Sequence, residues 1–99
     1  MGTYSSSTGR RLYINGVLEA SDNASGAIDA IGSNIFIGDN PNLSPRQFQG
    51  NIDEVAIWNK ALNSEEVASI YNEGNGLDPM ENSGNYSSSD DVQGYWKFI

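Results

Sequence analysis

The segment from Gly50 to Gly74 constrains the fold of this chain more than any other part of its sequence. It opens with the apolar run 52–58, Ile-Asp-Glu-Val-Ala-Ile-Trp, which is rich in β-branched and aromatic residues and too short for a surface helix. Side chains alternate across a strand, so Ile52, Ala56 and Trp58 fall on one face while Val55 and Ile57 fall on the other. Both faces of the predicted strand are therefore partly apolar, which indicates a strand with material packed on each side.

A helix is predicted to follow this strand, at about residues 64–73. Ser64 is a good N-cap, and two glutamates in the first turn suit the positive end of the helix dipole. Gly74 is the expected left-handed stop. The apolar stripe has the i, i+3, i+4 spacing and consists of Val67, Ile70 and Tyr71. A helix of about ten residues is marginal alone in water, so we expect it to lie on a sheet.

The first half of the chain predicts further strands. Asn15-Gly16 is the strongest two-residue hairpin signal, because a type I′ turn needs positive φ at both central positions, and alternating residues flank it. Residues 34–38, Asn-Ile-Phe-Ile-Gly, predict another strand with Ile35 and Ile37 on one face. The order of elements indicates an all-β, antiparallel fold with one short surface helix.

Composition excludes several classes of function. The 99 residues suit one small domain, and thirteen acidic against five basic residues give a net charge of −8, which disfavours nucleic acid and anionic membranes as partners. The chain has no cysteine and no histidine, so thiol chemistry and the commonest general base are excluded. No apolar window is long enough for membrane insertion, and residues 1–7 lack a signal-peptide core. We predict no catalytic residues and no enzymatic activity.

Three linked motifs and the N-terminus carry a family resemblance. Gly2-Thr-Tyr, then residues 11–18, 35–38 and 48–67, resemble laminin-G-like (LamG) modules of the concanavalin A-like lectin/glucanase superfamily in consistent order. The resemblance implies an antiparallel jelly-roll β-sandwich. It also implies a non-enzymatic extracellular binding or adhesion module, with carbohydrate as the favoured ligand class. The alternatives are a structural spacer or assembly module without a ligand, and a remnant of a glycoside hydrolase.

The resemblance covers only part of a module. Residues 1–79 resemble its C-terminal half, residues 80–91 read as a Ser/Asn/Asp-rich flexible linker, and residues 92–99 resemble the first strand of a module of the same kind. We interpret the chain as a fragment of a longer, tandem protein whose setting is extracellular or at the cell surface. The alternative interpretation is a stand-alone evolved or engineered small domain.

Half of a sandwich leaves the apolar face of one sheet exposed and its edge strands unpaired. The tail strand 92–98 could fold back and complete the sheet within its own chain. Alternatively, copies could pack through the open sheet face or exchange their tail strands, and this homo-oligomer is the favoured solution.

Two adjacent carboxylates in the 52–58 strand call for an explanation. Asp53 and Glu54 are expected to point to opposite faces, so they could not flank one glycosidic bond. The resemblance implies that Asp53 is a ligand of a structural calcium ion, which takes six to eight oxygen ligands. The alternative for Asp53 is a carboxylate bonded to backbone amides, to Arg46 or to Lys60.

A polar loop and several aromatic residues are the candidates for ligand binding. Asp39, Asn40 and Asn42 offer carbonyl and carboxylate oxygens to a sugar or to calcium, with a solvated turn as the alternative. Trp96 could stack on a sugar ring, with packing as the alternative. The other aromatic residues considered for the same role are Tyr4, Tyr13, Phe36 and Tyr95.

Overall fold

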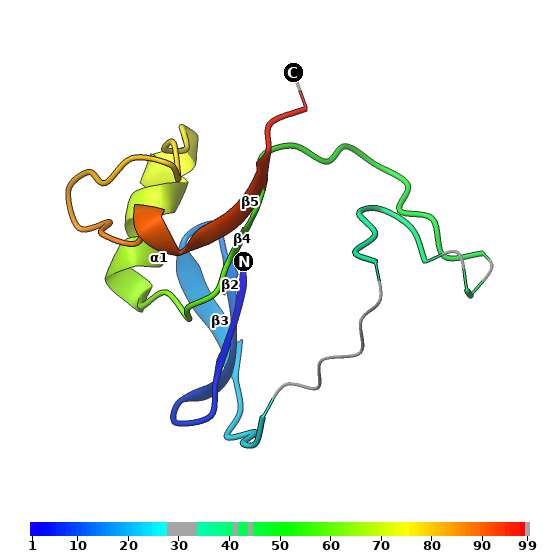
Figure 1. Cartoon of the computed structure of the whole chain (residues 1–99), viewed down its shortest axis with the longest axis horizontal. Coiled ribbons are helices and arrows are strands. Elements are labelled where there is room, and N and C mark those ends of the chain that lie inside the picture. The colour runs from blue at the N-terminus through cyan, green and yellow to red at the C-terminus, as the bar shows by residue number, and fades with distance from the viewer. Residues whose placement is uncertain (28–33, 41, 44, 99) are drawn as a thin grey trace.

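The computed structural model describes residues 1–27, 34–40, 42–43 and 45–98, and consists of two small antiparallel sheets and one α-helix (Figure 1). Residue 99 of the predicted tail strand and residues 41 and 44 of the polar loop lie outside the described part. The elements are β1 (Gly2–Ser5), β2 (Gly9–Ile14), β3 (Val17–Ser21), β4 (Val55–Trp58), α1 (Ser64–Tyr71), the 3-10 turns η1 (Asn72–Gly74) and η2 (Ser89–Asp91), and β5 (Val92–Trp96). The prediction of a mostly β, antiparallel fold with one short helix is confirmed.

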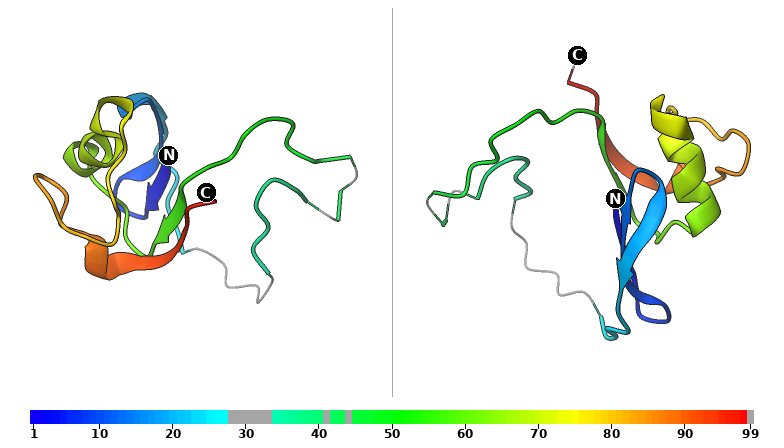
Figure 2. Two further views of the ribbon diagram at one scale, coloured as in Figure 1. Left: turned by 90° about the horizontal axis from the view of Figure 1, so that it is seen from above. Right: turned by 180° about the vertical axis from the view of Figure 1, so that it is seen from behind.

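The first sheet has the strand order β1-β2-β3 and contains the predicted hairpin. Asn15 and Gly16 both have positive φ, 52° and 78°, as a type I′ turn requires. The amide of Tyr13 donates to the carbonyl of Met1 over 2.8 Å, which extends the pairing of β1 with β2 to the first residue. The helix lies against one face of this sheet (Figure 2). The ring of Tyr71 lies close to the hairpin turn at Gly16.

Gly16→Ala is expected to destabilise the hairpin. Its φ of +78° is unfavourable for alanine, and an added Cβ would lie 2.9 Å from a ring carbon of Tyr71. We expect a loss of about 1–3 kcal/mol, seen as a drop of several degrees in the thermal midpoint. Gly2→Ala is the matched control, because a Cβ at residue 2 meets nothing within 4 Å. Equal midpoints for the two variants would contradict the turn geometry.

The second sheet pairs β4 with β5 in antiparallel register, Val55 opposite Trp96 and Ala56 opposite Tyr95. The tail strand thus folds back within its own chain. Of the two ways to complete a sheet, fold-back and association of copies, the structure shows the first for β5. The predicted strand over 52–58 begins too early: β4 starts at Val55, and Glu54 has a left-handed φ of 52°. The cause is local, because the Asp53 carboxylate accepts the Glu54 amide at 2.8 Å and competes with strand pairing.

Helix α1 ends two residues before its predicted limit, and both of its caps are asparagines. The N-cap is Asn63, not Ser64: its side chain accepts the Glu66 amide over 2.9 Å. The C-cap is Asn72, with a left-handed φ of 49°, and not Gly74, which lies one half-turn later in η1. Asparagine tolerates this conformation, so it stops the helix before the glycine is reached.

The hydrophobic core is small and lies between the helix, the first sheet and the segment before β5. Its buried members are Tyr13, Leu62, Val67 and Tyr86, with Trp58 and Ile70 packed against them. The predicted strand over 34–38 is wrong, since these residues form no strand and the Ile35 side chain is 68% exposed. They lie on a long arm that loops out from the two sheets (Figure 1), and within the described residues no strand pairs with them. No helix in the described ranges has the length and apolar character needed to cross a bilayer.

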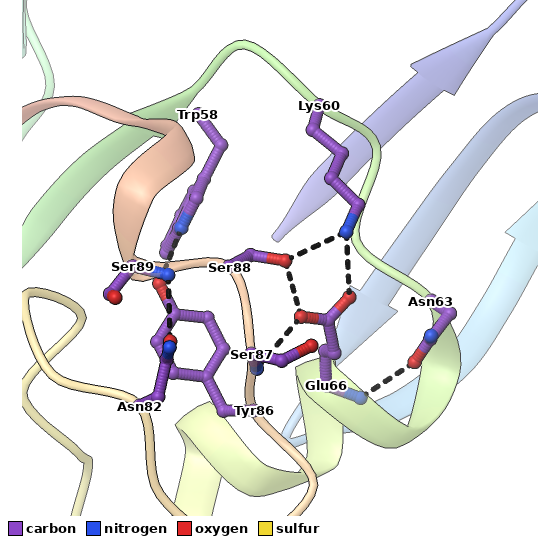
Figure 3. A network of polar contacts seen from close by, with 9 residues as sticks. All are labelled: Trp58, Lys60, Asn63, Glu66, Asn82, Tyr86, Ser87, Ser88 and Ser89. Atoms are coloured by element: carbon purple, nitrogen blue, oxygen red, sulfur yellow. Dashed lines mark hydrogen bonds and ion pairs between the residues drawn. The ribbon is translucent and has the colours of Figure 1, made fainter.

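The flexible linker predicted for residues 80–91 is wrong in its second half, because that part packs into the core. Tyr86 is 1% exposed and Ser88 is fully buried. The Tyr86 hydroxyl accepts the indole N–H of Trp58 over 2.8 Å (Figure 3). It also donates to the carbonyl of Pro79 over 2.7 Å. The serine-rich composition indicated flexibility. The buried ring of Tyr86, whose hydroxyl has a donor and an acceptor partner, instead anchors the segment in the core.

Glu66 holds the same segment from the side of the helix (Figure 3). Its carboxylate is 2% exposed and accepts hydrogen bonds from the Ser88 hydroxyl and, over 3.2 Å, from the Ser87 amide. Lys60 Nζ lies 4.0 Å from this carboxylate and donates to Ser88 over 3.1 Å. Burial raises the pKa of Glu66, but these donors outweigh it and hold the pKa below its ordinary value. The segment preceding β5 is therefore tied to α1 by a satisfied buried charge.

Candidate functional site

A cleft of about 1000 Å³ lies where β1 approaches β4, and it is the candidate ligand site. Residues of β1, β4 and β5 line it, together with the end of α1 and the chain after it. Its size falls in the range of small-ligand sites. Aromatic and acidic side chains from four separate segments line it: Tyr4, Asp53, Glu54, Trp58, Tyr71 and Tyr95. Only the fold brings these residues together.

Asp53 and Glu54 both line the cleft, although regular strand alternation would place them on opposite faces. That alternation does not hold here, because β4 begins after both residues and Glu54 is left-handed. Tyr95 lies beside Glu54: partial burial and the neighbouring carboxylate raise the pKa of the Tyr95 hydroxyl. The cleft therefore presents hydroxyl donors, carboxylate acceptors and aromatic rings on one surface.

Asp53 as a calcium ligand stays a prediction. One of its carboxylate oxygens is occupied by the Glu54 amide at 2.8 Å, and within the described ranges no three acidic side chains cluster closely enough to hold a metal ion. Asp53 and Glu54 are neighbours in sequence and supply at most two carboxylates. A calcium ion needs six to eight oxygens, so the acidic side chains described here do not fit a complete calcium cage.

The polar loop lies apart from the cleft. Asp39, Asn40 and Asn42 are exposed and line neither the cleft nor the smaller groove described below. The Asn40 side chain accepts the Asn42 amide over 3.2 Å, and the Asn40 carbonyl accepts the Leu43 amide over 3.0 Å. These bonds are typical of a turn that satisfies its own polar groups.

The aromatic candidates separate into different environments. Tyr4 and Tyr95 line the cleft, whereas Tyr13 is buried in the core and Phe36 is exposed on the arm. Trp96 lies in a second, apolar groove of about 490 Å³ with Phe98 and three isoleucines: Ile35, Ile37 and Ile52. Sequence reasoning missed Tyr71 as a cleft residue, because its helical spacing indicated core packing.

Comparison with protein families gives one match. A laminin-G-like family model, described as the concanavalin A-like lectin/glucanases superfamily, matches residues 1–68. The chain belongs to this superfamily. The match spans β1 to β4 and the first part of α1, including most of the cleft-lining residues. Comparisons with curated proteins and with solved structures give no significant match.

Membership in the concanavalin A-like superfamily agrees with the two antiparallel sheets and single helix, which form part of a β-sandwich. Tyr71, Tyr95 and the buried Tyr86 lie beyond the matched residues. Tyr71 and Tyr95 of the cleft, and the donors Ser87 and Ser88 that bind the Glu66 carboxylate, thus come from the part of the chain that the superfamily match does not cover.

Proposed function

We propose that this chain is a non-enzymatic, extracellular-type binding module and that the cleft between β1 and β4 takes a neutral carbohydrate. The observation that carries the proposal is the convergence of aromatic rings and two carboxylates in this cleft. Superfamily membership supports a binding role, since laminin-G-like modules are generally non-catalytic.

The chemistry of the cleft suits a polyhydroxylated, uncharged ligand. The apolar faces of sugar rings stack on aromatic side chains, while carboxylates accept hydrogen bonds from sugar hydroxyls. The net charge of −8 and the two carboxylates in the cleft repel acidic glycans. A neutral glycan therefore fits better than a sulfated or uronic-acid polymer.

A glycan array with and without calcium tests the ligand class. We expect binding of neutral glycans, confirmed by titration calorimetry, and an affinity loss of about tenfold for Tyr95→Ala or Glu54→Gln, because each change removes one stacking or hydrogen-bonding contact. A requirement for calcium would support Asp53 as a metal ligand, and Asp53→Asn should then abolish the calcium dependence.

Trp96→Ala is the matched control, since Trp96 follows Tyr95 in β5 but lies in the apolar groove. Loss of binding in Trp96→Ala with binding kept in Tyr95→Ala would move the site to that groove. Absence of binding under both conditions would favour a structural spacer. Hydrolysis of any bound glycan would contradict the non-enzymatic role.

A further inference from the structure

The chain contains two Asn-Gly dipeptides, Asn15-Gly16 in the turn between β2 and β3 and Asn75-Gly76 directly after η1. In this dipeptide the amide nitrogen of the glycine can approach the side-chain carbonyl carbon of the asparagine, because glycine has no Cβ to obstruct it. Both asparagines are exposed to solvent. The two pairs therefore have the same local chemistry and the same access to water, and only the fold distinguishes them.

The hydrogen bonds of the two glycine amides differ. The Gly76 amide donates to the carbonyl of Tyr71 over 3.1 Å, and the Gly76 carbonyl accepts Asn72 Nδ2 over 3.0 Å. The Asn75 amide also donates to the Asn72 carbonyl, over 3.0 Å. The Gly16 amide lies at the centre of the type I′ turn, and no acceptor in the described part of the chain is bonded to it. The fold thus holds the second pair in place and leaves the amide of the first without a partner.

We propose that Asn15 is a site of spontaneous deamidation and that the fold protects Asn75 from the same reaction. The Gly16 nitrogen attacks the side-chain carbonyl carbon of Asn15 and forms a C–N bond, while the side-chain amide leaves as ammonia with the Gly16 proton. Water then opens the resulting cyclic imide at either of its two carbonyls, which gives aspartate or isoaspartate. At Asn75 the attack first requires that the bonds of Gly76 and its neighbour break, so it waits for a local unfolding of the chain.

The isoaspartate product changes the backbone of the hairpin. It leads the chain through the former side chain and so adds one methylene to a turn of two residues. The type I′ geometry, with φ of 52° at Asn15 and 78° at Gly16, keeps Ile14 opposite Val17 and does not accommodate this insertion. Aspartate at the same position is tolerated, since Asp-Gly also suits a type I′ turn. The extra backbone atom, and not the added charge, therefore loosens the pairing of β2 with β3.

Peptide mapping by mass spectrometry, during incubation of the folded chain in mildly alkaline buffer, tests the proposal. We expect the amide of Asn15 to be lost about tenfold faster than that of Asn75, because the latter reacts only after several hydrogen bonds break. In concentrated urea the two rates should converge, since neither pair is then held by the fold. Equal rates in the folded chain, or a faster loss at Asn75, would overturn the proposal. The same ratio in urea would also overturn it, because neighbouring residues would then set the difference.

Two variants test the cause and the consequence. Asn72→Gly keeps the left-handed helix cap but removes the side-chain donor to Gly76, so the loss at Asn75 should become several times faster while the loss at Asn15 does not change. An unchanged rate at Asn75 would contradict its protection by these bonds. Asn15→Asp carries the new charge without the methylene and should melt near the temperature of the fresh chain. Aged protein that contains isoaspartate should melt several degrees lower, and equal midpoints would refute the effect on the hairpin.

Discussion

Tyr86→Ala is expected to unfold most of the chain at room temperature. Tyr86 is the most buried aromatic residue described, and its removal would leave a cavity beside Leu62, Val67 and Trp58. Truncation of a buried aromatic side chain costs about 3–5 kcal/mol, which is a large part of the stability of a small domain. Urea titration followed by tryptophan fluorescence measures the loss, because the Trp58 indole donates to the Tyr86 hydroxyl over 2.8 Å.

Tyr86→Phe distinguishes the contribution of the Tyr86 hydroxyl to stability from that of its ring. The ring still fills the core, but the Trp58 N–H and the Pro79 carbonyl lose their shared partner, so we expect a smaller loss of about 1–3 kcal/mol. Tyr71→Phe removes the hydroxyl of a tyrosine that is 36% exposed, compared with 1% for Tyr86, and should change stability little. If Tyr86→Ala unfolds at the same urea concentration as Tyr71→Phe, the 79–91 segment does not pack as described.

Glu66→Ala is expected to give the second largest loss, about 2–4 kcal/mol. The substitution leaves the buried Ser88 hydroxyl and the Ser87 amide without an acceptor and removes the ion pair with Lys60. Glu65→Ala is the matched control, since Glu65 is the neighbouring first-turn glutamate and is exposed. Its expected cost is below about 1 kcal/mol, from the helix dipole alone. Chemical denaturation at neutral pH compares the two, and similar losses would contradict a buried role for Glu66.

The same carboxylate predicts an acid dependence of stability. The folded-state pKa of Glu66 is below its ordinary value of 4.5, so its contribution is complete above about pH 5 and is lost as the pH falls through the folded pKa. Stability should therefore decline below about pH 4.5, and Glu66→Gln should flatten this decline. If the free energy of unfolding of Glu66→Gln falls with acid pH as steeply as that of the unchanged chain, the decline is due to other carboxylates.

Local sequence signals predicted those elements whose conformation depends on neighbouring residues. The Asn15-Gly16 turn follows from the φ preferences of its two residues, and α1 follows from the spacing of its apolar stripe. The helix caps were misassigned, although Asn63-Ser-Glu-Glu66 is itself an Asn-x-x-Glu capping signal. The strand predicted at 34–38 failed for a different reason: alternation gives a strand propensity, but a strand forms only beside a partner.

The sequence by itself determined the secondary-structure class, the superfamily resemblance and the acidic, cysteine-free chemistry, because each of these depends on residue type and short-range order. The tertiary structure decided the position of everything that depends on contacts between distant segments. It placed Tyr86 and Ser88 in the core instead of in a linker, and it brought Asp53 and Glu54 into one cleft with Tyr95. These arrangements depend on which surfaces meet, and burial free energy is gained only when those surfaces come together in the fold.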